Sequence, residues 1–255
     1  MLKRVNLLVA AFIASTIGSG ALAQDVVRVG MSATPYPPFV IYQSSGERAG
    51  FEVDILNAVC EEAKVSCEIS GFDWAGLMPA LSGNKIDMIF NSMSVTDERK
   101  KTIAFSRPYY KTAAMFVGEK GTSFDISPEG LKGKNIGVTA SSIHANYLKK
   151  LYPESTIRYY NVYTELNADL SAGRLDLSLG DALQVEEYLA SPEGQNFESK
   201  GVAADDPTLG EGVGAGFRQE DTALREKIDA AIGALTASPK YDEIQKKYFS
   251  VPVKP

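Results

Sequence analysis

Polar side chains suited to ligand binding gather in the segment from Asn91 to Arg99. This segment follows a buried strand-like run, residues 86–90, and opens a helix. It therefore lies at the carboxyl end of a strand, which is where open α/β sheets bind ligands. Ser92 and Ser94 offer hydroxyl and main-chain groups at that position. The segment is the chain's first candidate for a binding site.

Arg99 falls in the first turn of that helix, and Thr96 suits the N-cap position before it. A cation in the first turn is unfavourable with respect to the helix dipole, so its presence suggests that an anion is expected. Arginine is the side chain that grips a carboxylate with two parallel hydrogen bonds. The spacing alone is equally compatible with a surface arginine paired with Asp97 or Glu98.

The elements that must position these residues alternate between strand and helix, which predicts an α/β fold. In the first half, the patterns predict strands at 26–31, 66–70 and 86–90 and helices at 51–64 and 75–81. In the second half, they predict strands at 134–139, 157–160 and 175–179 and helices at 143–151, 166–172 and 182–190. A glycine-rich strand at 210–216, a helix at 222–238 and a last segment at 241–249 follow.

Two consecutive α/β units indicate two lobes. The C-terminal portion has no partner layer of its own, so it is expected to return and pack on the first lobe. The chain then crosses between the lobes twice, near 111–116 and 210–216, which makes a hinge. We expect residues 24–112 and 212–255 to form lobe 1 and residues 113–211 to form lobe 2.

The first 23 residues have the pattern of a secretory signal peptide. Lys3 and Arg4 precede an apolar run at 7–17, and Ala21-Leu22-Ala23 supplies the small residues of a cleavage site. The apolar run is shorter than the about 20 residues that a membrane-spanning helix needs. No cysteine lies near the cleavage site, so the sequence gives no sign of a lipid anchor. The pattern predicts a free protein in the periplasm.

The composition of the chain excludes several classes of binding partner. Lys and Arg number 26 against 32 Asp and Glu, and no stretch concentrates basic residues, which argues against nucleic acid as a partner. In an exported chain, the pair Cys60 and Cys67 is expected to form a disulfide. Two cysteines and a single histidine, His144, cannot by themselves make a four-ligand zinc site. There is no glycine-rich phosphate loop, which argues against nucleotide binding. We therefore expect no cofactor, and the Cys and His count gives no metal site.

Four motifs together carry a resemblance to a known family: Gly50-Phe51-Glu52-Val53-Asp54, Asn91 to Arg99, Ile103-Ala104-Phe105-Ser106, and Ala172-Gly173-Arg174-Leu175-Asp176. They resemble the polar amino-acid-binding family of periplasmic solute-binding proteins, and most of all its lysine/arginine/ornithine-, histidine- and opine-binding members. The resemblance runs from about residue 26 to 249. It implies a two-lobed periplasmic binding protein fold with a ligand cleft between the lobes, a monomeric protein, and the membrane permease of an ABC transporter as partner. The Cys60/Cys67 spacing also resembles the disulfide of that subgroup.

The resemblance also implies roles for individual residues. Arg99 would bind the α-carboxylate of an amino acid, helped by Ser94 and by the turn at Ser142-Ile143. Asp181 would accept hydrogen bonds from the α-ammonium. Asp181 directly follows a predicted strand, so it could also cap the next helix. Tyr36 and Trp74 would sandwich the ligand side chain, and Trp74 could otherwise be a core residue.

Three positions depart from the subgroup that binds basic ligands. Ser32-Ala33-Thr34 stands where those relatives carry an acid in the first loop, Asn91 stands where they often have Ser, and His144 stands where they often have Gln. We expect His144 at the surface. Glu52 matches a position that can hold an acid near the pocket. The predicted ligand is therefore a polar or basic amino acid, or a derivative, and Ser32, Asn91, Ser92 and Glu52 complete the predicted binding residues.

Two other functions fit the same resemblance. Cyclohexadienyl dehydratases are similar to this family and use a cleft carboxylate, a part that Glu52 or Asp181 could play. A binding protein that reports to a membrane sensor would have the same pocket and another partner. The expected function is binding without catalysis, because Asp181 has a sufficient role as the ammonium partner.

Overall fold

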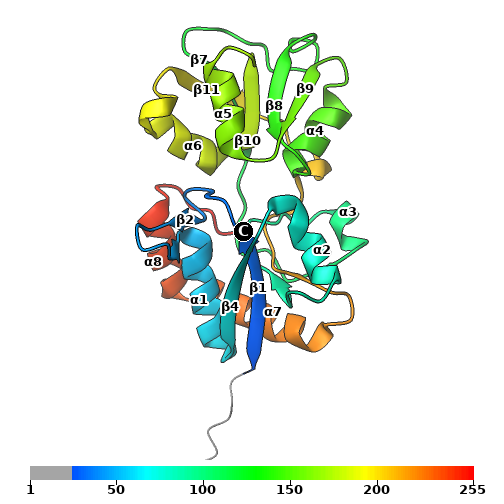
Figure 1. Cartoon of the computed structure of the whole chain (residues 1–255), viewed down its shortest axis with the longest axis vertical. Helices are drawn as coiled ribbons and strands as arrows, with labels where there is room; N and C mark the ends of the chain where they lie inside the picture. The colour runs from blue at the N-terminus through cyan, green and yellow to red at the C-terminus, as the bar shows by residue number, and fades with distance from the viewer. Residues whose placement is uncertain (1–24) are drawn as a thin grey trace, which may run out of the picture.

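Two separate five-stranded sheets organise the chain in the computed structural model, which describes residues 25–255 (Figure 1). One sheet has the strand order β4-β1-β5-β12-β6, and we call the part built on it lobe 1. The other has the order β11-β7-β10-β8-β9 and belongs to lobe 2. The predicted signal peptide lies outside the described residues. The mixed α/β, two-lobed architecture is the one expected.

Lobe 1 combines residues from both ends of the described chain. Its strands are β1 (Val26–Ser32), β4 (Ser66–Phe72), β5 (Met88–Ile89), β6 (Ala104–Phe105) and β12 (Gly216–Phe217), beside a small ribbon of β2 (Ile41–Tyr42) and β3 (Arg48–Ala49). Its helical elements are α1 (Phe51–Ala63), the 3-10 turn η1 (Trp74–Gly76), α2 (Leu77–Ser82), α3 (Asp97–Lys100), α7 (Thr222–Ala237) and α8 (Pro239–Tyr248).

Lobe 2 is built from one continuous stretch of chain. Its strands are β7 (Ala114–Glu119), β8 (Asn135–Thr139), β9 (Thr156–Tyr160), β10 (Leu177–Asp181) and β11 (Phe197–Val202). Its helices are α4 (Ile143–Leu151), α5 (Tyr163–Ser171) and α6 (Ala182–Ala190), and the short turns η2 (Pro192–Gly194) and η3 (Pro207–Leu209) follow.

The C-terminal helices pack on the core of lobe 1. Apolar residues of α7, among them Ile228 and Ile232, share one buried cluster with Phe51 and Ile55 of α1. These α1 residues recur at helical spacing, so a single face of the helix is apolar and must be covered. Helices from the start and the end of the chain therefore enclose the same core.

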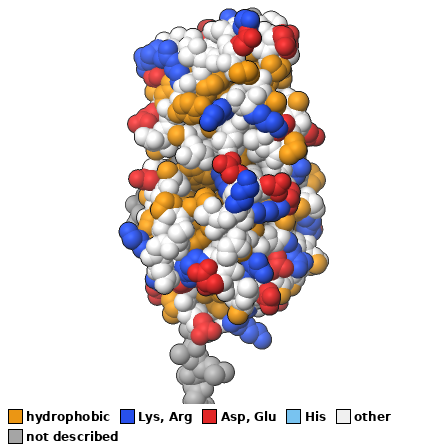
Figure 2. Space-filling view, turned by 90° about the vertical axis from the view of Figure 1, so that its right-hand side faces the viewer, with side chains coloured by type: hydrophobic (Ala, Val, Ile, Leu, Met, Phe, Trp, Pro, Cys, Tyr) orange, Lys and Arg blue, Asp and Glu red, His pale blue; other side chains and the backbone are white. Residues whose placement is uncertain are grey.

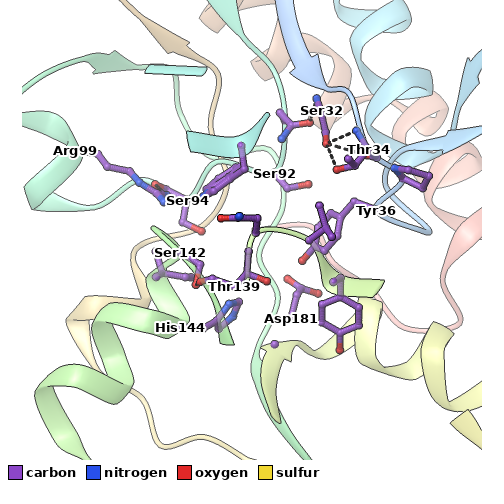
Figure 3. Close-up of a pocket in the computed structure, with 18 residues that line it drawn as sticks. Ser32, Thr34, Tyr36, Ser92, Ser94, Arg99, Thr139, Ser142, His144 and Asp181 are labelled. Carbon is purple, nitrogen blue, oxygen red and sulfur yellow. Dashed lines mark hydrogen bonds between the residues drawn. The ribbon is translucent and has the colours of Figure 1, made fainter. Parts of the chain in front are cut away.

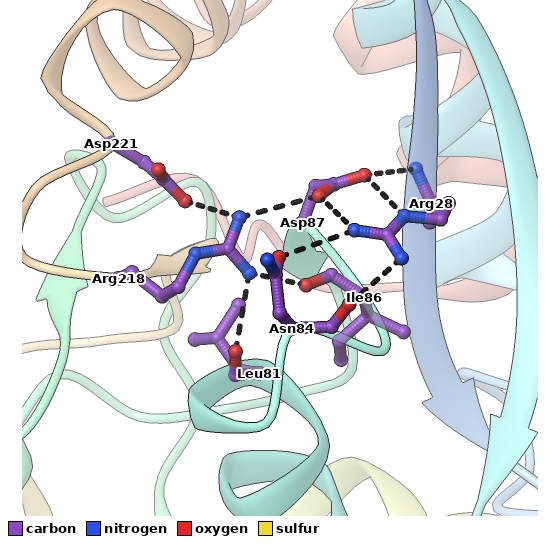
Figure 4. A network of polar contacts seen from close by, with 7 residues as sticks. All are labelled: Arg28, Leu81, Asn84, Ile86, Asp87, Arg218 and Asp221. Carbon is purple, nitrogen blue, oxygen red and sulfur yellow. Dashed lines mark hydrogen bonds and ion pairs between the residues drawn. The ribbon is translucent and has the colours of Figure 1, made fainter.

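A polar network ties the returning chain to the first strand of lobe 1 (Figure 4). Asp87, just before β5, accepts from Arg28 of β1 at 2.7 Å and from Arg218, which follows β12, at 3.2 Å. The hydrogen bond from Arg28 is the main cause that lowers the pKa of Asp87 to about 2. Arg218 also donates to the carbonyls of Ile86 and Leu81. The network joins three separate segments of lobe 1 around one carboxylate.

The second crossing is less regular than predicted. Only Gly216–Phe217 forms strand β12, and the segment before it makes single bridges, through Val213, to Ser94 and Tyr110. Gly210 and Gly212 have φ values of 81° and 132°, a region that interrupts an extended strand. Strands β2, β3, β6, β7 and β11 were not predicted, and β5 is shorter than the run at 86–90.

The face of the molecule seen in Figure 2 carries acidic and basic side chains that are interspersed. No broad basic surface covers that face. None of the helices in residues 25–255 is both long enough and apolar enough to cross a membrane.

Cys60 near the end of α1 and Cys67 in β4 form the expected disulfide, with their Cα atoms 6.3 Å apart. The bond fastens α1 to the edge strand of the lobe 1 sheet.

Reducing this disulfide is expected to lower the free energy of unfolding by about 2–3 kcal/mol, because the bond closes only a short loop. Urea unfolding with and without reductant measures the loss. The double variant Cys60→Ser/Cys67→Ser should match the reduced protein and should be insensitive to reductant. Equal stability of the oxidised and reduced proteins would contradict the prediction.

Candidate ligand-binding site

A cavity lies between the two lobes, at the carboxyl ends of strands from both sheets (Figure 3). Ser32 ends β1, Thr139 ends β8 and Asp181 ends β10. Lobe 1 lines the cavity with Ser32, Thr34, Pro35, Tyr36, Trp74, Asn91, Ser92, Ser94 and Arg99. Lobe 2 lines it with Thr139, Ser142, Ile143, His144, Asn161, Val162, Tyr163, Gly180 and Asp181. Ten of the predicted residues thus face one space, and Glu52 does not.

Arg99 is held in the wall by its own short helix and by backbone carbonyls. Thr96 caps α3, and its hydroxyl accepts from the Arg99 amide at 3.2 Å. The guanidinium donates to the Ser94 carbonyl at 2.9 Å and to the Ser141 carbonyl at 3.4 Å, and it lies 5.3 Å from the ring centre of Trp74. Burial lowers the pKa of Arg99 to about 10, so the side chain remains a cation at neutral pH.

The neighbouring acids do not neutralise Arg99. Asp97 pairs with Lys100 at 3.7 Å, and Glu98 accepts from the side chain of Asn146 at 3.1 Å. Among residues 25–255, no carboxylate forms an ion pair with Arg99. The alternative of a surface arginine paired within α3 is therefore wrong.

Asp181 supplies the opposite charge from lobe 2. It caps α6 by accepting from the Leu183 amide at 3.0 Å, and it also accepts from the Thr112 hydroxyl. Burial raises the pKa of Asp181 to about 6. The carboxylate has no cationic partner within the described part of the chain. Capping occupies only part of its hydrogen-bonding capacity, so it can serve both the helix and the cavity.

The beginning of α4 also faces the cavity. Ser142 is its N-cap, accepting from the Ala145 amide at 3.1 Å and donating to the Thr139 carbonyl at 2.7 Å. Helix amides at this end have no partner inside the helix and carry a partial positive charge, which favours anions. The Ser142 hydroxyl is already engaged, so the amides of this turn are the groups available to an anion.

The rest of the wall from lobe 1 is neutral, polar and aromatic. Asn91 accepts from the Ser32 amide at 2.7 Å through its side-chain oxygen, which leaves its NH₂ group as a donor. Ser32 donates to the Thr34 carbonyl at 2.8 Å. Tyr36 stacks on Phe39 at a ring distance of 5.3 Å, so the Tyr36 ring is fixed from behind by the core.

Glu52, predicted as a binding residue near the pocket, lies behind the wall rather than in it and does not line the cavity. It is fully buried as the second residue of α1. Ser92 donates to it from both its amide at 2.6 Å and its hydroxyl at 3.0 Å, and the hydroxyls of Tyr109 and Tyr110 donate at 2.7 and 3.0 Å. Burial raises the pKa of Glu52, and these donors oppose that shift. The inward face of α1 directs the carboxylate towards the core, where Ser92 separates it from the cavity.

His144 faces the cavity, so its expected place at the outer surface is wrong. It is the second residue of α4 and lies across from Arg99. Burial, and then the charge of Arg99, lowers the pKa of His144 to about 4, so the ring is neutral at pH 7. Lobe 1 covers a helix face that would otherwise be exposed to solvent.

Several lining residues were not predicted: Thr34, Pro35, Thr139, Asn161, Val162, Tyr163 and Gly180. Thr139 and Gly180 lie at the carboxyl ends of predicted strands, and Asn161 follows another. The rule that places ligands at such ends could therefore have found these three. In residues 25–255, no group of three or more His, Cys, Asp or Glu side chains is arranged to hold a metal ion.

Two α/β lobes, two crossings and an interlobe cavity with opposite charges define a two-lobed binding protein of the periplasmic type. The chain belongs to the bacterial extracellular solute-binding proteins, family 3, whose family model matches residues 27–251. It is 43% identical over 235 residues to an L-arginine-binding protein of Pseudomonas aeruginosa, covering 91% of this chain and 90% of that protein. It is 33% identical to the lysine/arginine/ornithine-binding periplasmic protein of Escherichia coli, covering 93% and 92% of the two chains.

Solved structures of amino-acid-binding proteins have the same fold. A Salmonella typhimurium periplasmic binding protein described as having high arginine specificity superposes with a TM-score of 0.81, at 30% identity over 89% of this chain and 100% of that one. An ancestral amino-acid-binding protein, described as a precursor of cyclohexadienyl dehydratase, superposes with a TM-score of 0.77 at 25% identity. It covers 88% of this chain and 95% of that one.

Proposed function

We propose that the protein is a monomer that captures a basic L-amino acid, arginine or a close relative of it, in the periplasm. It then delivers this ligand to an ABC transporter permease. Arg99 binds the α-carboxylate and Asp181 the α-ammonium. The observation that carries the proposal is a pair of opposite charges in one cavity, each without a countercharge among the described residues. A zwitterion supplies both countercharges and thereby offsets the cost of burying them.

The carboxylate site combines three kinds of donor. The guanidinium of Arg99 is anchored on two carbonyls, which fixes its plane and leaves other N–H groups for the ligand. Amides at the start of α4 approach from the opposite lobe, so the carboxylate is bound only when the lobes come together. A ligand that contacts both lobes favours their closed arrangement, because its affinity for that arrangement is higher.

The charge of the site favours a cationic ligand side chain. Glu52 accepts four hydrogen bonds, and an ionised carboxylate has about four acceptor positions, so these donors support the charged form against the burial that raises the pKa of Glu52. No Lys or Arg pairs with it among residues 25–255. Ser92 donates its only hydroxyl hydrogen to Glu52, so the lone pairs of that oxygen are free for a ligand N–H group. Arg99, Asp181 and Glu52 sum to one negative charge, which a guanidinium or ammonium side chain balances.

The names of the relatives support the same ligand class, since several are arginine-binding proteins. The aromatic faces of Tyr36 and Trp74 are suited to flank a guanidinium.

A thermal-shift screen of the mature protein tests the proposal against the alternatives. Arginine, lysine, ornithine, histidine, glutamine, opines and prephenate are compared at equal concentration. A ligand that binds only the folded protein stabilises it by about 2.7 kcal/mol at a hundredfold excess over its dissociation constant. We expect the largest rise in midpoint with basic amino acids. A rise with prephenate alone, followed by its turnover, would instead favour the dehydratase.

Replacing Glu52 with Gln is expected to weaken the binding of arginine about tenfold or more and that of glutamine far less, because only the cationic ligand loses a charge interaction in a low-dielectric setting. Isothermal calorimetry with both ligands measures the difference. Glu62→Gln, an exposed change on the same helix, is the matched control. An equal loss for both ligands would mean that Glu52 only supports the wall, and the argument for a basic side chain would fail.

A further inference from the structure

The two lobes meet through polar contacts on one flank of the cavity. There, α3 of lobe 1 and α4 of lobe 2 lie on the same side of the molecule, at the right of Figure 1. The Ser141 carbonyl accepts from the indole nitrogen of Trp74 at 3.2 Å and from the guanidinium of Arg99 at 3.4 Å. Farther out, Asn146 of α4 donates from its side-chain nitrogen to the Glu98 carboxylate at 3.1 Å.

The pair Glu98–Asn146 differs from the other two contacts in its relation to the cavity. Trp74 and Arg99 line the cavity, whereas Glu98 and Asn146 are exposed and do not. Glu98 directly precedes Arg99, and Asn146 comes two residues after His144. The pair therefore lies at the rim of the cavity. Apart from bonds made by the two crossing segments, these three are the hydrogen bonds between the lobes in the described part of the chain.

The opposite flank closes through apolar contact instead. Leu183, in the first turn of α6, is 7% exposed and belongs to the apolar cluster of lobe 1, together with Phe39 and Tyr36 at its edge. The lobes are thus joined on both sides of the cavity, and apart from Arg99 the side chains that join them are not the two charges that face it.

We propose that Glu98 and Asn146 form an interlobe latch, which raises the affinity for the ligand by stabilising the closed arrangement without touching the ligand. The inference rests on the proposed function, since it concerns the binding of an amino acid between the lobes. A contact that exists only when the lobes are together shifts the equilibrium between open and closed forms. The apparent dissociation constant is the intrinsic one divided by the fraction of protein in the binding-competent form. A rim contact therefore changes the affinity for every ligand by the same factor.

The test uses Glu98→Ala, Asn146→Ala and the double variant, each as the mature protein. Calorimetry with arginine and with lysine is expected to give an affinity about threefold to tenfold lower in each single variant, the range of a typical hydrogen bond. The factor should be equal for the two ligands. The double variant should lose less than the sum of the two single losses, because the two side chains contact each other. The loss should appear as faster dissociation.

Two exposed residues away from the cleft provide matched controls. Glu62→Ala on α1 and Asn196→Ala on lobe 2 remove side chains of the same two types. Neither control side chain makes a hydrogen bond among residues 25–255. Both controls should keep the wild-type affinity. An affinity within twofold of wild type in the latch variants, additive losses, or a factor that differs between ligands would each overturn the latch.

A ligand-free readout separates this inference from the proposed function. Trp74 is the only tryptophan, and its indole contacts the other lobe. Its emission should shift to the red in the double variant compared with the wild type and the controls, because opening exposes the indole to water. If no amino acid binds the wild type, the proposed function fails, and the emission alone decides the latch. Identical spectra in wild type and double variant would then overturn it.

Discussion

Replacing Arg99 with alanine is expected to abolish measurable binding of the amino acid while leaving the fold intact. The ligand carboxylate would be buried without a countercharge, a loss of about 3–5 kcal/mol. That loss corresponds to about two to three decades or more in affinity. Arg99→Lys should not restore binding, because an ammonium cannot hold the Ser94 and Ser141 carbonyls and still grip a carboxylate with two parallel bonds.

Calorimetry and circular dichroism on both variants provide the measurement. Arg158→Ala, which removes an exposed arginine from β9, is the matched control and should bind as the wild type does. Wild-type affinity in Arg99→Ala would show that Arg99 does not bind the ligand carboxylate, and the proposed anion-binding group would be wrong.

Asp181→Asn is expected to abolish binding and, at the same time, to stabilise the ligand-free protein. Burial raises the pKa of Asp181 to about 6, above the value for an unfolded aspartate. At pH 7 the folded protein therefore carries an ionised carboxylate in an environment that penalises it, and unfolding relieves that penalty. A shift of this size corresponds to at most about 3 kcal/mol. Because Asp181 is partly exposed to the cavity, we expect a gain of about 1–2 kcal/mol at pH 7 from the neutral amide. Asparagine also retains the cap of α6.

The raised pKa predicts a pH profile for binding. As the pH falls through about 6, Asp181 takes up a proton in the free protein and can no longer pair with the ammonium of the ligand. The affinity of the wild type should fall by up to about tenfold per pH unit below that value. Any residual binding in Asp181→Asn should lack this dependence. Asp205→Asn, an exposed change on lobe 2, should keep both the wild-type profile and the wild-type stability.

Local rules were sufficient for much of the site. Thr96 and Arg99 could be placed because N-capping and the helix dipole act within one turn, and the structure has the predicted cap. Asp181 could be placed because a strand, a polar residue and a helix follow one another directly. The spacing of Phe51 and Ile55 likewise predicted the apolar face of α1, which is set by helical periodicity alone.

Features that depend on the meeting of distant segments could not be predicted. The direction of Glu52 depends on Tyr109 and Tyr110, which come from a loop almost sixty residues away in sequence. His144 is covered only because lobe 1 closes over α4, so its sequence neighbours contain no signal of burial. Strands as short as β6 and β12 exist because they pair with each other, and two residues are too few to show a period.

The order of strands in lobe 1 has a consequence for how the protein folds. Strand β12 lies between β5 and β6, so that sheet is interrupted until residue 217 has joined it. Its outer helices, α7 and α8, come later still. Lobe 2, by contrast, takes all its strands from residues 114–202 and can assemble first. Lobe 1 depends on contacts of very long sequence separation, which form slowly. For the export to the periplasm proposed above, this order means that lobe 1 stays unformed until nearly all of the chain has been synthesised.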